Sequence, residues 1–384
     1  MSRLFNPIKV PAVFGATGSL GRCVCRQIAL NGLRCAHLAA MTSHDGLAGL
    51  IAELRPRSTS FKGSPSTALS LAMSKAGCIR EQSIAGALAG CDGAIVVSSG
   101  LDGVGPIAQA ARLGIPVAAG NKEALVACGK YLKSLIRKDD DGSAIRPVDS
   151  EHSAAAVLIR QAGGIGNVSR LVLTGTGGAV RAVPHELRSG LTPGEVLRHP
   201  VWKMGPKITV DSATLMNKAF EIVEAAVLFD MPVSRISVMF DPTANVHAAI
   251  ETSSGVLAYR APADMAIPVR IALGMDHGDE DHVLTDDEAG EALDSLLVPD
   301  QLAMRPIALG RTVVEAGGCM PMVLAVADEA AVSAFLRGMI GFGDIVPLLE
   351  DALERFHAFS SLDPLDPAVL EHVRAEVEDF FQPA

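Results

Sequence analysis

Several kinds of segment are missing from this sequence, and their absence narrows the classes of protein it can encode. No apolar run reaches the roughly 18 residues that a membrane-spanning helix needs, and the opening MSRLFNPIKV lacks the apolar stretch and cleavage pattern of a secretory signal. Basic residues are not in excess, because the formal net charge is −10. The chain therefore has no general attraction for nucleic acid or anionic membrane, and we expect neither as a partner.

Paired cysteines are missing as well. The seven cysteines are scattered and odd in number, and they form no CxxC pair and no Cys/His spacing typical of zinc. This distribution predicts reduced, packed thiols and a cytoplasmic location. With 384 residues, 49% hydrophobic and 20% charged, the chain has room for two or three domains with substantial cores.

Short apolar runs alternate with helical patterns through roughly the first 150 residues. Strands are expected at 8–14, 35–41, 93–98 and 115–119. Such alternation predicts an α/β fold with a Rossmann-like, doubly wound parallel sheet over 1–150.

The remaining sequence predicts three further segments. A central α/β domain is expected over 151–274, with strands at 171–174, 236–240 and 256–259 and a long helix over 213–229 capped by Ser212. The acid-rich stretch 275–304 is typical of a solvated linker rather than a metal site. Helices at 321–336, 345–356 and 367–381 predict a C-terminal helical domain over 305–384.

A glycine-rich turn, GATGSLG, follows the first expected strand. Gly15, Gly18 and Gly21 allow a tight turn and close approach to a pyrophosphate, while Thr17 and Ser19 offer hydroxyl donors. A strand-to-helix turn can need glycine for steric reasons alone, but the position between strand and helix favours dinucleotide binding. At the end of the second strand, Ala-Met-Thr-Ser-His has no acid for the ribose of NAD, which favours NADP, and no lysine or arginine for a 2′-phosphate.

Two groups of acids stand in apolar surroundings. Asp149 and Glu151, two apart in an extended stretch, would face the same side and suit two ligands of Mg²⁺ or Mn²⁺. Alternatively, Asp149 caps the following helix and Glu151 complements its dipole. Glu221 would add a third ligand from the helix after Ser212, with Lys218 close by to meet a phosphate; the alternative is an exposed Lys–Glu pair.

Other polar residues stand where a ligand could be held. Asn121, Lys122 and Glu123 follow the strand at 115–119, where parallel strands present their ligands; the alternative, less favoured, is a structural Lys–Glu helix start. Trp202 and Met204, on a glycine-flanked loop near 199–207, favour a mobile apolar lid, with burial in the core as the alternative.

These motifs resemble the 1-deoxy-D-xylulose 5-phosphate reductoisomerase family of non-mevalonate isoprenoid biosynthesis. The matching stretches are GATGSLG, GNKEALVACG, PVDSEH, LTGTGG, HPVWKMGPKITVDSATLMNKAFEIVEA and, more faintly, VADEAAVSAFL. The resemblance implies an NADP-binding domain, a catalytic and dimerisation domain, a C-terminal helical bundle and a homodimer. It also implies NADPH, Mn²⁺ or Mg²⁺, and a small phosphorylated sugar that is rearranged by a retro-aldol step and then reduced to 2-C-methyl-D-erythritol 4-phosphate.

The resemblance also assigns roles to particular residues. The implied metal ligands and catalytic groups are Asp149, Glu151 and Glu221, with Lys122 as a further catalytic group. The implied substrate contacts are Lys122, Ser150, Glu151, Thr176, His199, Trp202, Met204, Ser212, Asn217, Lys218 and Glu221. The implied nucleotide contacts are Thr17, Gly18, Ser19, Leu20, Thr42, Ser43, Asn121, Glu123 and Gly205.

Some positions depart from the family pattern. The family's Gly-Lys/Arg-Asn after the second strand is Met41-Thr42-Ser43 here, and its His-Pro-Gln-Ser is Asp241-Pro242-Thr243-Ala244. These departures leave a second function open, a related NAD(P)-dependent isomerising oxidoreductase for another phosphorylated ketose or polyol. A catalytically silent nucleotide-binding regulator is a third class, disfavoured by the costly carboxylates.

Overall fold

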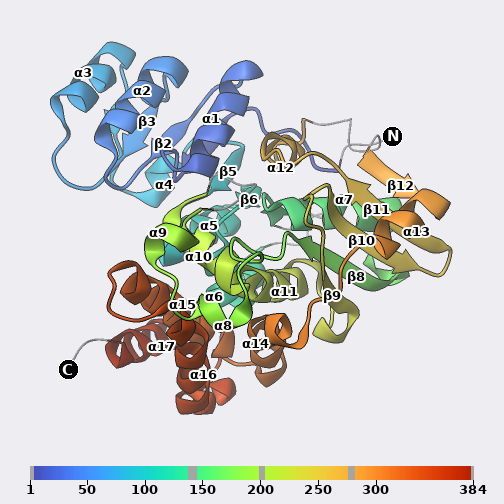
Figure 1. Ribbon diagram of the computed structural model, residues 1–384. Coiled ribbons are helices and arrows are strands. Elements are labelled where there is room, and N and C mark those ends of the chain that lie inside the picture. The colour runs from blue at the N-terminus through green and yellow to red at the C-terminus, as the bar shows by residue number, and fades with distance from the viewer. Residues whose placement is uncertain (1–3, 137–144, 199–203, 276–281, 382–384) are drawn as a thin grey trace. The chain divides into compact units, whose positions relative to one another are not determined.

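The computed structural model describes residues 4–136, 145–198, 204–275 and 282–381 (Figure 1). The chain forms two compact units, each made of several segments. The first comprises 1–124, 132–153 and 264–280, and the second 125–131, 154–263 and 281–384. Among the described helices, none combines the length and apolarity needed to cross a membrane.

The first unit is built on a seven-stranded parallel sheet in the order β4-β3-β2-β1-β5-β6-β7. Its strands are β1 (Pro11–Phe14), β2 (His37–Ala39), β3 (Ser58–Ser60), β4 (Ile79–Arg80), β5 (Gly93–Val96), β6 (Val117–Ala119) and β7 (Arg146–Pro147). The strand order reverses beside β1, which confirms the predicted doubly wound fold and places the ligand-binding crevice of such sheets at the ends of β1 and β5.

Helices cover this sheet because its central strands β1, β5 and β6 are apolar on both faces. They are α1 (Ser19–Leu30), α2 (His44–Leu54), α3 (Thr67–Ala76), α4 (Ile84–Ala87), α5 (Val104–Arg112) and α12 (Ala266–Ala272), while α6 (Lys122–Ser134) and α7 (Ser150–Gln161) have residues in both units. Every residue of β1, β5 and β6 is buried, as expected of strands between two helical layers. Helix α1 buries Val24, Cys25 and Ile28, a spacing of one helical face.

The second unit contains a five-stranded sheet in the order β12-β11-β10-β8-β9. The strands are β8 (Val168–Gly175), β9 (Ile236–Phe240), β10 (Val246–Thr252), β11 (Gly255–Arg260) and β12 (Val283–Thr285). Only β8 and β9 are parallel neighbours. The expected linker over 275–304 was wrong in this respect, because it contains β12 and helix α13 (Asp286–Asp294). Ala289 and Ala292 of α13 pack into the core beside this sheet. The acid-rich sequence therefore contains a short apolar helix face that was not predicted.

The helix expected over 213–229 is in fact two helices. Helix α10 (Pro206–Thr214) begins with a proline at its first turn, a favoured position, and α11 (Met216–Phe229) follows after Leu215, whose φ is +67°. Ser212 therefore lies inside α10 and does not cap α11, which corrects the prediction. The short helices α8 (His185–Arg188) and α9 (Pro193–Val196) precede this pair.

The C-terminal part is helical, as predicted. Its helices are α14 (Gln301–Ala316), α15 (Met320–Leu336), α16 (Ile345–Arg355) and α17 (Pro367–Phe380). A Cβ on Gly310 of α14 would stand 2.2 Å from the Ala219 carbonyl oxygen of α11, so glycine permits close packing of these helices. The Lys207 ammonium of α10 lies 2.6 Å from Asp211 and 2.7 Å from Asp328 of α15. All seven cysteines are free thiols.

His37 provides a test of the first unit's core. The imidazole on β2 is fully buried; Nδ1 lies 2.9 Å from Ser58 Oγ and Nε2 3.0 Å from Ser60 Oγ of β3. Burial, and next the Arg57 charge, lower the pKa of His37 from 6.5 to about 4. Since the unfolded chain binds this proton more readily, stability is present above pH 6.5 and is lost as the pH falls toward 4.

We expect the free energy of unfolding to fall by about 2 kcal/mol between pH 7 and pH 5 through this histidine. The measurement is urea denaturation of the unaltered chain and of His37→Gln at both pH values. The variant, which has no such titration, should lose about 2 kcal/mol less than the unaltered chain over this interval. Equal pH dependence of the two proteins would contradict the assignment.

Candidate active site

The glycine-rich turn between β1 and α1 folds tightly, and several of its amides already donate to carbonyl oxygens of β2 and of the turn itself. Gly15 has φ +91°, and a Cβ there would stand 2.4 Å from the Ser98 amide nitrogen. A Cβ on Gly21 would stand 2.1 Å from the Gly15 carbonyl oxygen. Helix α1 begins at Ser19 with Gly18 as its N-cap, and no side chain caps this end. The amide donors and positive dipole end of α1 therefore suit an anion such as pyrophosphate.

The ends of β5 and β6 meet this turn. The Asn121 amide nitrogen donates to the Ser98 carbonyl at 2.7 Å, and its oxygen accepts from the Ala124 amide at 2.8 Å, so it caps α6. Gly120 lies close to Leu20, since a Cβ there would be 2.8 Å from Leu20 Cδ2. The structure thus brings the predicted nucleotide residues of α1 and β6 together at the crevice expected for a doubly wound sheet.

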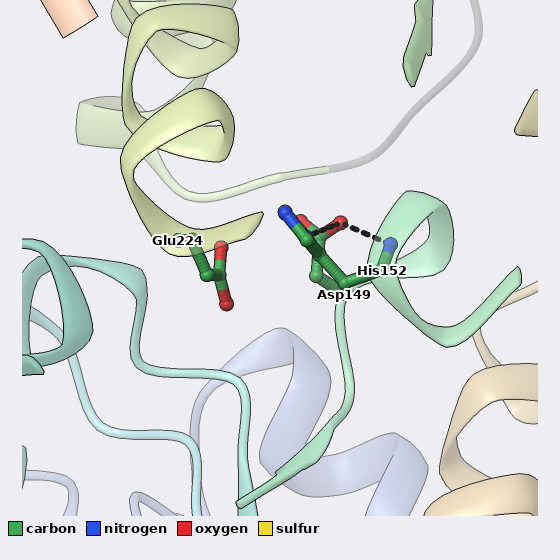
Figure 2. Close-up of side chains that lie close together, drawn as sticks. All are labelled: Asp149, His152 and Glu224. Carbon is green, nitrogen blue, oxygen red and sulfur yellow. Dashed lines mark hydrogen bonds and ion pairs between the residues drawn. The ribbon is translucent and has the colours of Figure 1, made fainter. Parts of the chain in front are cut away.

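Lys122, which is buried, and Asp149, which is half-buried, form an ion pair beyond the ends of β6 and β7. Lys122 Nζ donates to Asp149 Oδ2 at 2.8 Å. Asp149 Oδ1 accepts from the Glu151 amide at 3.2 Å and lies 3.0 Å from His152 Nδ1 (Figure 2). The carboxylate therefore caps α7, as the alternative had it, and the prediction of an extended stretch over 149–151 was wrong.

The start of α7 carries the second acid of this group. The Ser150 hydroxyl donates to Glu151 Oε2 at 2.6 Å. Both residues stand in the first turn of α7, where the helix dipole favours a negative charge. A helical turn therefore presents Asp149 and Glu151, each with oxygen atoms typical of a hard divalent cation site.

In the second unit, a glycine-rich turn after β8 packs against α10 and α11. A Cβ on Gly175 would stand 2.7 Å from Lys218 Cε, and one on Gly178, with φ +86°, would stand 2.4 Å from the Ser212 carbonyl oxygen. Thr176 lies between these glycines and is buried. The predicted phosphate residues Thr176, Ser212 and Lys218 are therefore gathered in one place, from three separate elements.

Helix α11 presents charged groups that are buried. Lys218 Nζ donates to Glu221 Oε2 and to the Thr174 carbonyl, both at 2.6 Å, and Asn217 donates to Glu221 Oε1 at 2.5 Å. Glu221 is 0% exposed, which rules out the alternative of a solvated Lys–Glu pair. Glu224, one turn further along α11 and also drawn in Figure 2, is 1% exposed. Burying ionised groups is costly unless they are paired, and here Lys218 and Glu221 pair with one another.

Two residues near this turn were not predicted. Arg181 Nη1 donates to the Thr176 carbonyl at 2.6 Å and to the Pro242 carbonyl at 3.1 Å. The Asp241 carboxylate accepts from the amides of Thr243, Asn245 and Val246. Although burial alone raises the pKa of Asp241, these hydrogen bonds and the one from the Thr243 hydroxyl bring it below its usual value. The spacing from Asp241 to its backbone donors, typical of an Asx turn, was a signal available in the sequence.

The remaining predicted residues are less tightly placed. Met204 and Gly205 precede α10, with Gly205 as its exposed N-cap. Thr42 and Ser43 are exposed beyond β2, with Ser43 as the N-cap of α2. Glu123 lies in the first turn of α6. His199 and Trp202 lie outside the described residues.

Comparison with known proteins gives one consistent result. Family models for 1-deoxy-D-xylulose 5-phosphate reductoisomerase match residues 12–129, for its C-terminal domain 145–229, and for a DXP reductoisomerase C-terminal domain 261–376. Curated reductoisomerases from Thermomicrobium roseum and Xanthomonas oryzae pv. oryzae are 35% and 36% identical, covering 95% and 94% of this chain and 94% of each relative.

Solved structures agree with the sequence matches. A DOX-P reductoisomerase in complex with NADPH, fosmidomycin and magnesium has a TM-score of 0.84 at 26% identity, covering 97% of both chains. The Zymomonas mobilis enzyme in complex with NADPH has a TM-score of 0.78 at 26% identity, covering 99% of this chain and 100% of that one.

These matches, together with a nucleotide turn on a parallel sheet, identify the class of the protein as an NADP-dependent oxidoreductase. Full-length matches at this identity leave the alternative, an enzyme for another phosphorylated ketose or polyol, without support. The chain belongs to the 1-deoxy-D-xylulose 5-phosphate reductoisomerase family.

The pair of Lys218 and Glu221 predicts a large effect on stability. Lys218→Met removes a donor from a buried carboxylate, and we expect the free energy of unfolding to fall by about 3 kcal/mol. Adding Glu221→Gln to this variant should recover part of the loss, because the unpaired charge is then gone. Urea denaturation of the two single variants and the double variant measures the coupling. Strictly additive effects would show that the two side chains do not stabilise one another.

Proposed function

We propose that this chain converts 1-deoxy-D-xylulose 5-phosphate to 2-C-methyl-D-erythritol 4-phosphate with NADPH and a divalent cation. The observation that carries the proposal is the Lys218 ammonium, buried 2.6 Å from both Glu221 and the Thr174 carbonyl beside a glycine-rich turn. That arrangement provides a phosphate seat and a metal-binding carboxylate on successive turns of one helix.

The first unit supplies the nucleotide site. Its support is the uncapped start of α1 and the glycines that let a pyrophosphate approach the backbone. The residues proposed to contact NADPH are Thr17, Gly18, Ser19, Leu20, Thr42, Ser43, Asn121, Glu123 and Gly205. Both the nitrogen and the oxygen of the Asn121 side-chain amide are hydrogen-bonded. We therefore propose that Asn121 forms a rigid part of the crevice surface that contacts the nucleotide.

Asp149, Glu151 and Glu221 are the proposed ligands of Mg²⁺ or Mn²⁺. Three carboxylates form an all-oxygen donor set, which these hard cations prefer. Each carboxylate is also oriented by a neighbouring donor: Lys122 holds Asp149, Ser150 holds Glu151, and Asn217 and Lys218 hold Glu221. When bound, the cation supplies Lewis acidity to the substrate's ketone and adjacent hydroxyl, and NADPH supplies the hydride.

The chain's own groups bind and orient the substrate. Thr176, Ser212, Asn217 and Lys218 are proposed to grip the phosphate, and Lys122, Ser150 and Glu151 to contact the reacting carbons. The phosphate grip gives binding energy remote from the bond that breaks, which can serve positioning. His199, Trp202 and Met204 complete the proposal as residues that cover the substrate and exclude water.

The finer assignments follow from the same family resemblance. They are an NADP-binding domain over 1–150, a catalytic and dimerisation domain over 151–274, a homodimer, a cytoplasmic location and activity with Mn²⁺ as well as Mg²⁺. The free, buried thiols are consistent with a reducing compartment.

NADPH oxidation in the presence of 1-deoxy-D-xylulose 5-phosphate tests the proposal. Turnover should require Mg²⁺ or Mn²⁺ and be abolished by EDTA. Glu221→Gln should lower kcat at least about 100-fold, since loss of a metal ligand removes several kcal/mol of stabilisation of the transition state.

The matched control is Glu251→Gln, which makes the same change at a half-buried acid on β10 that pairs with Arg170. It should keep the activity of the unaltered chain. Turnover that persists in EDTA, or that survives Glu221→Gln, would refute the metal assignment. If the unaltered chain shows no turnover with either metal, the assignment of 1-deoxy-D-xylulose 5-phosphate as its substrate is refuted.

A further inference from the structure

The tip of β2 lacks the basic residue that an NADP site needs to hold a 2′-phosphate. In doubly wound folds the adenosine ribose lies at this tip, where an acid selects NAD and a nearby arginine accommodates NADP. Positions 40–44 are Ala, Met, Thr, Ser and His. The selecting cation must therefore come from another element.

The structure brings Arg22 of α1 to this position. A Cβ built on Gly46, in the first turn of α2, would stand 2.6 Å from Ser43 Oγ and 2.8 Å from Arg22 Nη2. The serine hydroxyl and the guanidinium therefore lie beside one another, over a glycine that leaves them room. Arg22 is 21 positions away from Ser43 in the sequence, so no local sequence motif predicts that the two side chains lie together.

The guanidinium is held in place without being neutralised. Its Nε donates to the Thr17 carbonyl at 3.1 Å, within the nucleotide turn itself. Among the residues that the structure describes, no carboxylate pairs with Arg22, and its side chain is exposed. The nearest acid in the sequence, Asp45, accepts from the Ser66 hydroxyl at 3.0 Å. The Nη atoms of Arg22 thus retain donors for an anion, in the fork geometry that suits phosphate.

Ser43 contributes a second donor. It is the N-cap residue of α2, but its side chain makes no capping hydrogen bond. The hydroxyl can therefore serve a ligand, and the dipole of this eleven-residue helix favours a negative charge there.

We propose that Arg22, assisted by Ser43, binds the 2′-phosphate of NADPH and sets the preference for NADPH over NADH. This inference rests on the proposed function, because it requires the nucleotide to bind at the turn between β1 and α1. It assigns the specificity to a residue on α1 in place of the lysine or arginine that relatives of this family carry after the second strand.

Titration calorimetry with two small probes isolates the 2′-phosphate. Adenosine 2′,5′-bisphosphate and adenosine 5′-monophosphate differ only in that group. Arg22→Met should lower the affinity for the bisphosphate and for NADPH by about 10- to 100-fold, the range expected for loss of a charge-assisted hydrogen bond. The monophosphate and NADH should keep their affinities within about twofold.

Matched variants separate this role from general effects on α1. Arg26→Met removes the same charge one turn further along the helix and should change neither probe's affinity. Arg22→Lys keeps the positive charge but loses the forked guanidinium. Its affinity for the bisphosphate should lie between those of Arg22→Met and the unaltered chain. Ser43→Ala should lower the affinity for the bisphosphate by about three- to tenfold. It should not destabilise α2, because the Ser43 side chain makes no capping hydrogen bond.

The outcomes are distinguishable. If Arg22→Met lowers the affinity for both probes equally, or for neither, the inference is overturned while the proposed function stands. A preference of the unaltered chain for NADH overturns the inference together with the cofactor named in the proposed function, and leaves the substrate and metal assignments standing. If the unaltered chain binds neither NADPH nor NADH, the proposed function fails, and this assignment fails with it.

Discussion

The buried ammonium of Lys218 is the interaction on which the second unit's site depends. A lysine removed from water is stable only if acceptors replace its hydration, and here a carboxylate and a main-chain carbonyl do so at 2.6 Å. The carbonyl belongs to Thr174, at the end of β8, so the same bond fixes α11 to the sheet. Gly175 must be a glycine because the lysine side chain occupies the space of its Cβ. Charge, packing and backbone conformation therefore constrain one another at this point.

Helix N-termini organise the first unit's site in a comparable way. Gly18 and Asn121 begin α1 and α6, and Asp149 begins α7; each of these helices follows a strand of the parallel sheet. The capping side chains of Asn121 and Asp149 also bond to Ser98 and Lys122. A residue that must cap a helix has little rotameric freedom, so the helix start itself orients the group that is to meet a ligand. The capping role of Asp149 is therefore compatible with the metal-binding role proposed for it.

The sequence was most informative where the pattern is local. The strand at Pro11–Phe14, the glycine turn and the helix that follows it were all predicted, because apolar runs and glycine spacing act over a few residues. The break at Leu215 was not, since a left-handed leucine carries no local signal and tertiary packing imposes it. The strand at Val283–Thr285 was hidden by neighbouring acids that face away from the core. Burial of Glu221 was equally invisible, because only the packed helices remove it from water.

A net charge of −10 raises the question of how this protein attracts two anionic ligands. Lys122 and Lys218 are each paired with a carboxylate, so their positive charge is largely balanced before any ligand arrives. Amide groups at the starts of helices then become important, because their partial positive charge is fixed and carries no counter-ion. Arg22 is different, since it is exposed and its described contacts include no carboxylate. On the proposed function, the full positive charge of Arg22 would select the nucleotide by its 2′-phosphate, while the two paired lysines would orient the carboxylates proposed to bind the metal.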